Sequence, residues 1–164
     1  MARKRGIVIT IAILAAITAV SFSIWLIPQK EEPSFVVSDF KAYLESSQAK
    51  QKVISDEIEI DLQAMLAGTV TPDNFIMRAE ASTSQINVLI IELVESRAPQ
   101  EWYESYQNYD ESLKSYNSYL RETIVLAKKI KESNSNDIKE NLERIGVLKE
   151  ESEQFALKAD KTKP

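Results

Sequence analysis

The chain has 164 residues, a formal net charge of −5, and neither cysteine nor histidine. Without cysteine it has no disulfide framework and no thiol chemistry. Without histidine it lacks the commonest general base and the commonest metal ligand. All 25 acidic residues follow residue 28, so the C-terminal part is acidic, which disfavours nucleic acid and anionic lipid headgroups as partners.

Residues 6–28 form a nearly continuous apolar stretch that follows a short basic flank, residues 1–5. Because a helix needs about 20 apolar residues to cross the hydrocarbon core of a bilayer, this stretch predicts a transmembrane signal-anchor helix. The positive-inside rule places residues 1–5 in the cytoplasm. We therefore expect a single-pass protein of the cell membrane, with a linker at 29–37 and a domain outside at 38–164.

A cleaved secretory signal is an alternative interpretation of the same residues. A basic segment followed by an apolar one describes signals as well as anchors, and a small-residue cleavage site after Ser21 or Ser23 is conceivable. The apolar stretch is longer than the 7 to 15 residues, roughly, of a signal core, which favours the uncleaved anchor.

A third interpretation comes from residues 4–7 (KRGI), which resemble the leader of type IV pilin-like precursors, cut after a glycine preceded by basic residues. The resemblance is confined to the start of the chain and implies processing after Gly6. In the bacterial family a glutamate stands fifth after the cut, where this chain has Ile11, and the globular part normally contains a β-sheet.

Four amphipathic segments follow the linker, and in each of them apolar residues recur at alternating spacings of four and three, which is typical of helices with one buried face. Gly68 is typical of a helix end, and Thr71 with Pro72 of a helix start. Ala98 and Pro99 interrupt the pattern as a turn or as a kink. The predicted helices span about 38–67, 72–97, 99–133 and 137–160.

Helices joined by short turns lie antiparallel to their neighbours. The expected fold is therefore all-α: after the transmembrane helix, an antiparallel up-down-up-down four-helix bundle with coiled-coil-like packing. A pair of extended helical hairpins is the alternative.

The third helical segment is unusually aromatic, which makes it the first candidate site. In one interpretation most of these rings fill the core and their hydroxyls reach its edge. In the other, Tyr103, Tyr106 and Tyr119 line a groove for a partner helix or an apolar ligand. The candidate residues are Trp102, Tyr103, Tyr106, Tyr109, Tyr116 and Tyr119.

Four apolar residues fall outside the inward-facing stripes of the first two helices and form a candidate interface patch. They are Val53 and Ile60 in the first helix, and Met77 and Val88 in the second. Antiparallel pairing would set Ile60 near Met77. Single surface hydrophobes are normal in proteins, so the alternative is that the patch has no partner.

These features favour a non-enzymatic, membrane-anchored, extracytoplasmic helical bundle that acts through contacts with another protein or through self-association. It would be an adaptor, scaffold or accessory subunit of an envelope complex. The alternatives are a sensor-type bundle that binds a small ligand, and a pilin-like precursor processed after Gly6. No nucleophile paired with a base, phosphate loop or metal-ligand pattern is present, so we expect no catalytic residues, no metal and no cofactor.

Overall fold

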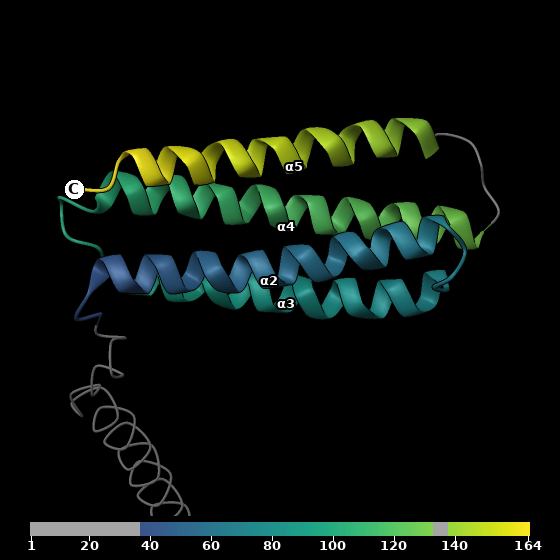
Figure 1. Cartoon of the computed structure of the whole chain (residues 1–164), viewed down its shortest axis with the longest axis horizontal. Coiled ribbons are helices and arrows are strands. Elements are labelled where there is room, and N and C mark those ends of the chain that lie inside the picture. The colour runs from purple at the N-terminus through teal and green to yellow at the C-terminus, as the bar shows by residue number, and fades with distance from the viewer. Residues whose placement is uncertain (1–36, 133–137) are drawn as a thin grey trace, which may run out of the picture. The chain divides into compact units, whose positions relative to one another are not determined.

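A computed structural model describes residues 37–132 and 138–164 (Figure 1). They belong to one compact unit, Phe35–Pro164. Within them the chain forms four helices that pack together and alternate in direction, with no strand, so the expected all-α fold of four packed helices is confirmed. The helices are α2 (Phe40–Leu66), α3 (Pro72–Glu95), α4 (Tyr103–Lys131) and α5 (Ile138–Lys161).

The predicted anchor at 6–28 lies outside the described residues. None of the helices in the described part of the chain combines the length and the apolar character that crossing a membrane requires. The structure therefore gives no support to the transmembrane segment, which stays a prediction from the sequence.

Side-chain caps and a glycine set three of the helix ends. The Asp39 carboxylate accepts a hydrogen bond from the Ala42 N–H at 2.9 Å and caps α2. The Thr71 hydroxyl caps α3 in the same way, with Pro72 at the first helical position. Gly68 adopts a φ of +75°, a left-handed conformation that ends α2 without a Cβ clash.

The break at Ala98 and Pro99 is a turn between two helices, which excludes the kink. Arg97 takes a left-handed φ of 48°, and the Trp102 N–H donates to the Pro99 carbonyl oxygen at 2.8 Å. As a result α4 begins at Tyr103 and not at residue 99, as the sequence suggested. Trp102 occupies its N-cap position.

The core lies along α4, which packs most extensively against α5 and α3. Phe75 and Ile86 of α3 and Leu113 and Leu120 of α4 are fully buried. Burying a side chain of this size stabilises the folded state by about 1.5–3 kcal/mol. The shared core explains why the helices close into one bundle and do not form two separate hairpins.

Small residues bring α4 and α5 close together. The Ser112 hydroxyl donates to the Ser152 carbonyl oxygen at 2.8 Å, and the Ser152 hydroxyl donates to that of Ser112 at 2.9 Å. Nearer the end of α5, the Ser105 hydroxyl donates to the Ala159 carbonyl oxygen at 2.7 Å. Such side chain to backbone bonds between helices require small residues on both sides.

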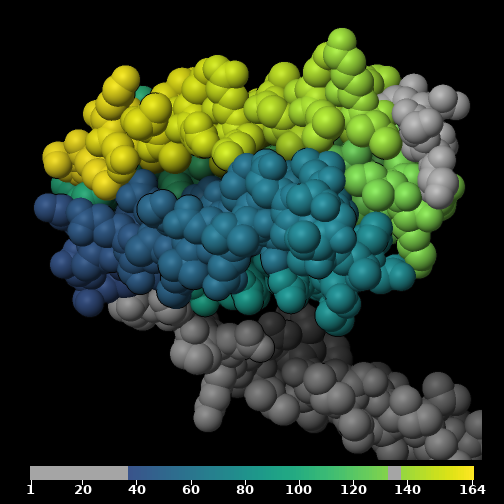
Figure 2. All heavy atoms as spheres, turned by 45° about the vertical axis from the view of Figure 1, so that its right-hand side comes forward, coloured from purple at the N-terminus to yellow at the C-terminus, as the bar shows by residue number. Residues whose placement is uncertain are grey.

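Helices α2 and α5 are the most loosely joined neighbours. They have no pair of Cα atoms within 8 Å in the described residues, although their atoms meet along one face of the bundle (Figure 2). Polar side chains bridge them: the Lys149 ammonium binds the Glu59 carboxylate at 2.8 Å, and the Gln48 amide donates to Asp160 at 3.0 Å. A polar groove is left between the two helices.

Candidate functional site

The structure divides the six aromatic candidates by burial. Tyr109, Tyr116, Tyr119 and Tyr106 are at most 5 % exposed, whereas Tyr103 is 54 % exposed. Trp102 is half-buried against the core. These positions agree with a core role for most of the rings, and they leave Tyr103 as the most accessible of the five tyrosines.

Tyr106 is the centre of an aromatic cluster at one end of the bundle. Its ring lies 5.9 Å from that of Phe40, 6.5 Å from that of Tyr43 and 6.3 Å from that of Trp102. Its hydroxyl donates to the Phe40 carbonyl oxygen at 2.8 Å. Burial raises the pKa of this hydroxyl well above its usual range, so it stays protonated and holds α4 to the start of α2.

Tyr119 does not share a surface with Tyr103 and Tyr106. It lies about 24 Å from Tyr103 along α4, at 1.5 Å per residue. Its ring stacks on that of Tyr116 with 5.1 Å between centroids, inside the core. The groove proposed from the sequence therefore reduces to its Tyr103 and Tyr106 end.

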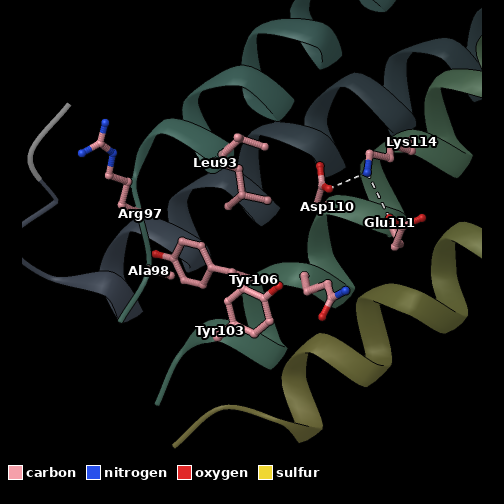
Figure 3. Close-up of a pocket in the computed structure, with 10 residues that line it drawn as sticks. Leu93, Arg97, Ala98, Tyr103, Tyr106, Asp110, Glu111 and Lys114 are labelled. Carbon is pink, nitrogen blue, oxygen red and sulfur yellow. Dashed lines mark hydrogen bonds and ion pairs between the residues drawn. The ribbon is translucent and has the colours of Figure 1, made fainter. Parts of the chain in front are cut away.

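At that end a hollow of about 370 Å³ opens between α3 and α4 (Figure 3). Its apolar lining includes Leu93, Val94 and Ala98 together with the two tyrosines. Arg97 lies at one end of the hollow, and an acidic and basic cluster lies at the other (Figure 3). We call this hollow the aromatic groove.

In the charged cluster beside the aromatic groove, one cation pairs with two carboxylates. The Lys114 ammonium lies 2.7 Å from Asp110 and 3.0 Å from Glu111, both of α4. The Asp110 and Glu111 carboxylates raise the pKa of Lys114, so the amine remains a cation at neutral pH and is unsuited to act as a base.

The four residues of the predicted interface patch are all exposed. Their exposed fractions are 58 % for Val53, 69 % for Ile60, 62 % for Met77 and 51 % for Val88. Val53 and Val88 flank a shallow groove of about 430 Å³ between α2 and α3, floored by apolar side chains. All four side chains are therefore accessible, and two of them border one apolar groove.

An ion pair between α2 and α3 lies next to the other two residues of the patch, Ile60 and Met77. Arg78 and Asp61 meet at 2.5 Å across α2 and α3, and they are the chain neighbours of Met77 and Ile60. The expectation that these two apolar residues lie at the same level of the bundle agrees with this contact.

Sequence reasoning missed two members of the exposed face of α3. Ile91 is 55 % exposed. Val94 is 62 % exposed, although it belongs with Leu93 to the apolar stripe of this helix that the spacing of four and three predicts to face inward. Val94 lines the open aromatic groove, and this is why its side chain remains accessible. We call Val53, Ile60, Met77, Val88 and Ile91 together the α2–α3 face.

The Glu59 to Lys149 pair gives a test of the α2 to α5 contact. Lys149, then Gln63, hold the pKa of Glu59 below its ordinary value of 4.5. This contribution to stability is present above pH 4.5 and is lost as pH falls through the lowered pKa. Because both side chains are 38 % exposed, it should be at most about 0.5 kcal/mol.

We expect Lys149→Met to lower the free energy of unfolding by at most about 0.5 kcal/mol at pH 7 and to have less effect at pH 3. Urea unfolding at both pH values measures it. Lys139→Met is the matched control, because Lys139 of α5 pairs, among the described residues, only with the exposed Glu143 of its own helix. An equal effect of both variants would contradict the assignment.

No arrangement for metal binding appears in residues 37–132 and 138–164: nowhere do three or more acidic side chains come together around a possible ion. Comparison with protein-family models, with curated proteins and with solved structures finds no match to this chain. Any functional proposal therefore depends on the chain's own sequence and surfaces.

Proposed function

We propose that this protein is a single-pass, membrane-anchored helical bundle that stands outside the cytoplasm and acts by contact with another protein, without enzymatic activity. It would serve as an adaptor, scaffold or accessory subunit of an envelope complex. The apolar stretch at 6–28 would provide the anchor and the basic flank its orientation.

The observation that carries the proposal is the α2–α3 face. It sets five large apolar side chains, each more than half exposed, on two neighbouring helices. Exposed apolar surface that is gathered in one place is typical of interaction sites, whereas scattered residues are not. The groove between Val53 and Val88 would accept an apolar side chain of a partner.

Charges flank this groove and would orient a partner. Lys50 of α2 and Glu92 of α3 both line it, so a partner would meet one charge of each sign beside an apolar strip. A helix with an apolar stripe and mixed flanking charges fits such a surface, and this is how helices commonly dock into grooves. We therefore infer a helical partner surface.

Site-directed crosslinking in native membranes tests the contact, because the chain has no cysteine of its own. We expect Val88→Cys to form a higher-mass adduct with a thiol-reactive crosslinker. Ser118→Cys, on the exposed side of α4, is the control and should form none. Equal adducts from both positions, or none from Val88→Cys, would contradict the proposal.

Placing a charge at position 88 is a second test of the same contact, because a carboxylate there would disfavour an apolar partner. With the crosslinking cysteine moved to the other side of the groove as Val53→Cys, Val88→Glu should reduce recovery of the crosslinked partner. It should change the free energy of unfolding by less than about 0.5 kcal/mol, because Val88 is exposed. A thermal melt of the variant provides the stability measurement. A loss of stability that parallels the loss of partner would assign Val88 to folding instead.

The anchor has its own test, independent of the partner. We expect the native protein to remain in membranes washed with alkaline carbonate and to keep its N-terminal residues. A mature chain that starts after Gly6 would favour the pilin-like alternative, and one that starts after Ser21 or Ser23 a cleaved signal.

A further inference from the structure

The α2–α3 face has the size of a stable interface between two proteins. Its helices contain 27 and 24 residues, so at about 1.5 Å per residue they are roughly 36–40 Å long. Two helices packed side by side are roughly 20 Å wide. The face therefore covers roughly 700–800 Å², close to the area that each partner contributes to a standard protein–protein interface.

Apolar and small side chains follow one another along the exposed side of α3. They recur at alternating spacings of four and three, the repeat by which one helix packs along another. The residues are Met77, Ala81, Ser84, Val88 and Ile91, all exposed. On α2, Val53 and Ile60 are exposed one heptad apart. The face thus carries a second helix-packing seam that the bundle itself does not use.

One charge of each sign borders the groove of this face. Lys50 of α2 is exposed and lines one wall, and Glu92 of α3 lines the other. Neither forms an ion pair within the described part of the chain. Glu92 accepts a long hydrogen bond, 3.4 Å, from the Tyr43 hydroxyl, which is neutral and leaves the charge of the carboxylate in place. Both charges therefore remain available to a partner.

A two-fold axis parallel to the helices makes this face complementary to itself. The rotation keeps every residue at its own level and sets α2 of one copy against α3 of the other, as in an isologous dimer. Lys50 and Glu92 line the same groove, so each Lys50 meets Glu92 of the second copy. Val53 meets Val88 of the second copy for the same reason.

The direction of this axis agrees with a chain that is anchored at one end. Helices α2 and α3 run in opposite directions (Figure 1), and rotation about their common direction leaves both copies of α2 beginning at the same end of the dimer. The linker at 29–37 would then enter both copies from the same side. This is the arrangement that suits two chains anchored next to each other in one membrane.

We propose that the α2–α3 face binds a second copy of this chain, about a two-fold axis parallel to α2 and α3. The inference rests on the proposed function, because it names the partner of the same face. Val53 of each copy packs against Val88 of the other. The Lys50 ammonium of each copy pairs with the Glu92 carboxylate of the other, in a charge-assisted contact.

Disulfide formation between two differently tagged variants of the full chain tests the contact in membranes. Cells that make Val53→Cys together with Val88→Cys should yield, after mild oxidation, a species of twice the chain mass that carries both tags. Ser118→Cys made together with Val88→Cys is the control, because Ser118 lies on the exposed side of α4, and should yield none. Absence of the doubly tagged species, or equal amounts of it in the control, overturns the proposal.

The Val88→Cys variant alone distinguishes a second copy from a different partner. An adduct with another protein, without the doubly tagged disulfide, shows that the second copy is wrong while the proposed function stands. No adduct of either kind contradicts the proposed function and the dimer together. An adduct of twice the chain mass that carries both tags supports both.

Exchange of charges tests the pairing of Lys50 with Glu92, by sedimentation equilibrium of the full chain in detergent micelles. Lys50→Glu opposes two carboxylates and Glu92→Lys opposes two ammonium groups, so each variant alone should dimerise more than about tenfold more weakly. An equal mixture of the two variants places opposite charges together again and should recover the dimer, which also shows that both variants fold.

Lys52→Glu is the matched control for this exchange. It makes the same change of charge on α2, but Lys52 does not line the groove of the α2–α3 face. We expect its dimer to be as tight as that of the unchanged protein. Undiminished dimerisation of Lys50→Glu and Glu92→Lys, or no recovery in their mixture, overturns the proposed pairing and its axis.

Discussion

Tyr119→Ala is expected to lower the free energy of unfolding by about 3–5 kcal/mol, as is typical when a buried aromatic ring is removed. Tyr119 is 2 % exposed and stacks on Tyr116 inside the core. The variant would leave a cavity that the surrounding helices cannot fill, and it would remove an aromatic contact. Tyr103→Ala is the contrasting variant, because 54 % of Tyr103 is exposed.

Urea unfolding followed by circular dichroism measures both effects. Tyr103→Ala should change the free energy of unfolding by less than about 0.5 kcal/mol. A stable Tyr119→Ala variant that fails to recover a partner would contradict the core assignment and restore the longer groove predicted from the sequence. A loss of stability in Tyr119→Ala alone would limit the aromatic groove to its Tyr103 and Tyr106 end.

The helix ends show what local sequence can predict. Thr71, Pro72 and Gly68 act through their own backbone and side-chain chemistry, so their roles were visible without the fold. The start of α4 was not visible in this way. Pro99 favours a helix start, but the chain first turns from Arg97 to Trp102. Arg97 takes a left-handed φ of 48° there, a conformation that usually marks glycine and that an arginine in the sequence does not signal.

The exposed residues of the candidate surfaces were also predictable only where their exposure depends on their own helix. Helical periodicity predicted the exposure of Val53, Ile60, Met77 and Val88, because a residue opposite the buried stripe faces away from the core in any bundle. It failed for Val94, which lies on the flank of α3. Exposure on a flank depends on whether the neighbouring helix covers it, and the aromatic groove leaves this flank open.

The polar groove was not predictable from the sequence, since it depends on the spacing between helices. Serine and alanine draw α5 onto α4 through bonds to the backbone, whereas α2 and α5 carry longer polar side chains where they meet. The same serines could have been interpreted as ordinary helix-surface residues. Their role follows from the helix that they face and not from their spacing alone.

The Ser112 to Ser152 contact makes this dependence on small residues testable. Ser112→Leu should lower the free energy of unfolding by about 3 kcal/mol, because it inserts a large side chain into a close helix contact and removes a bond from the Ser112 hydroxyl. Ser112→Ala should cost only about 1 kcal/mol, since it keeps the small size. The difference between the two measures the cost of forcing α4 and α5 apart.

Ser118→Leu is the matched control on the same helix. Ser118 is exposed, and its hydroxyl donates to the Lys114 carbonyl oxygen of its own helix, so the larger side chain has room in solvent. We expect a change of less than about 0.5 kcal/mol in urea unfolding. Equal stability of Ser112→Leu and Ser118→Leu would contradict a close α4 to α5 contact, and with it the spacing that leaves the groove open.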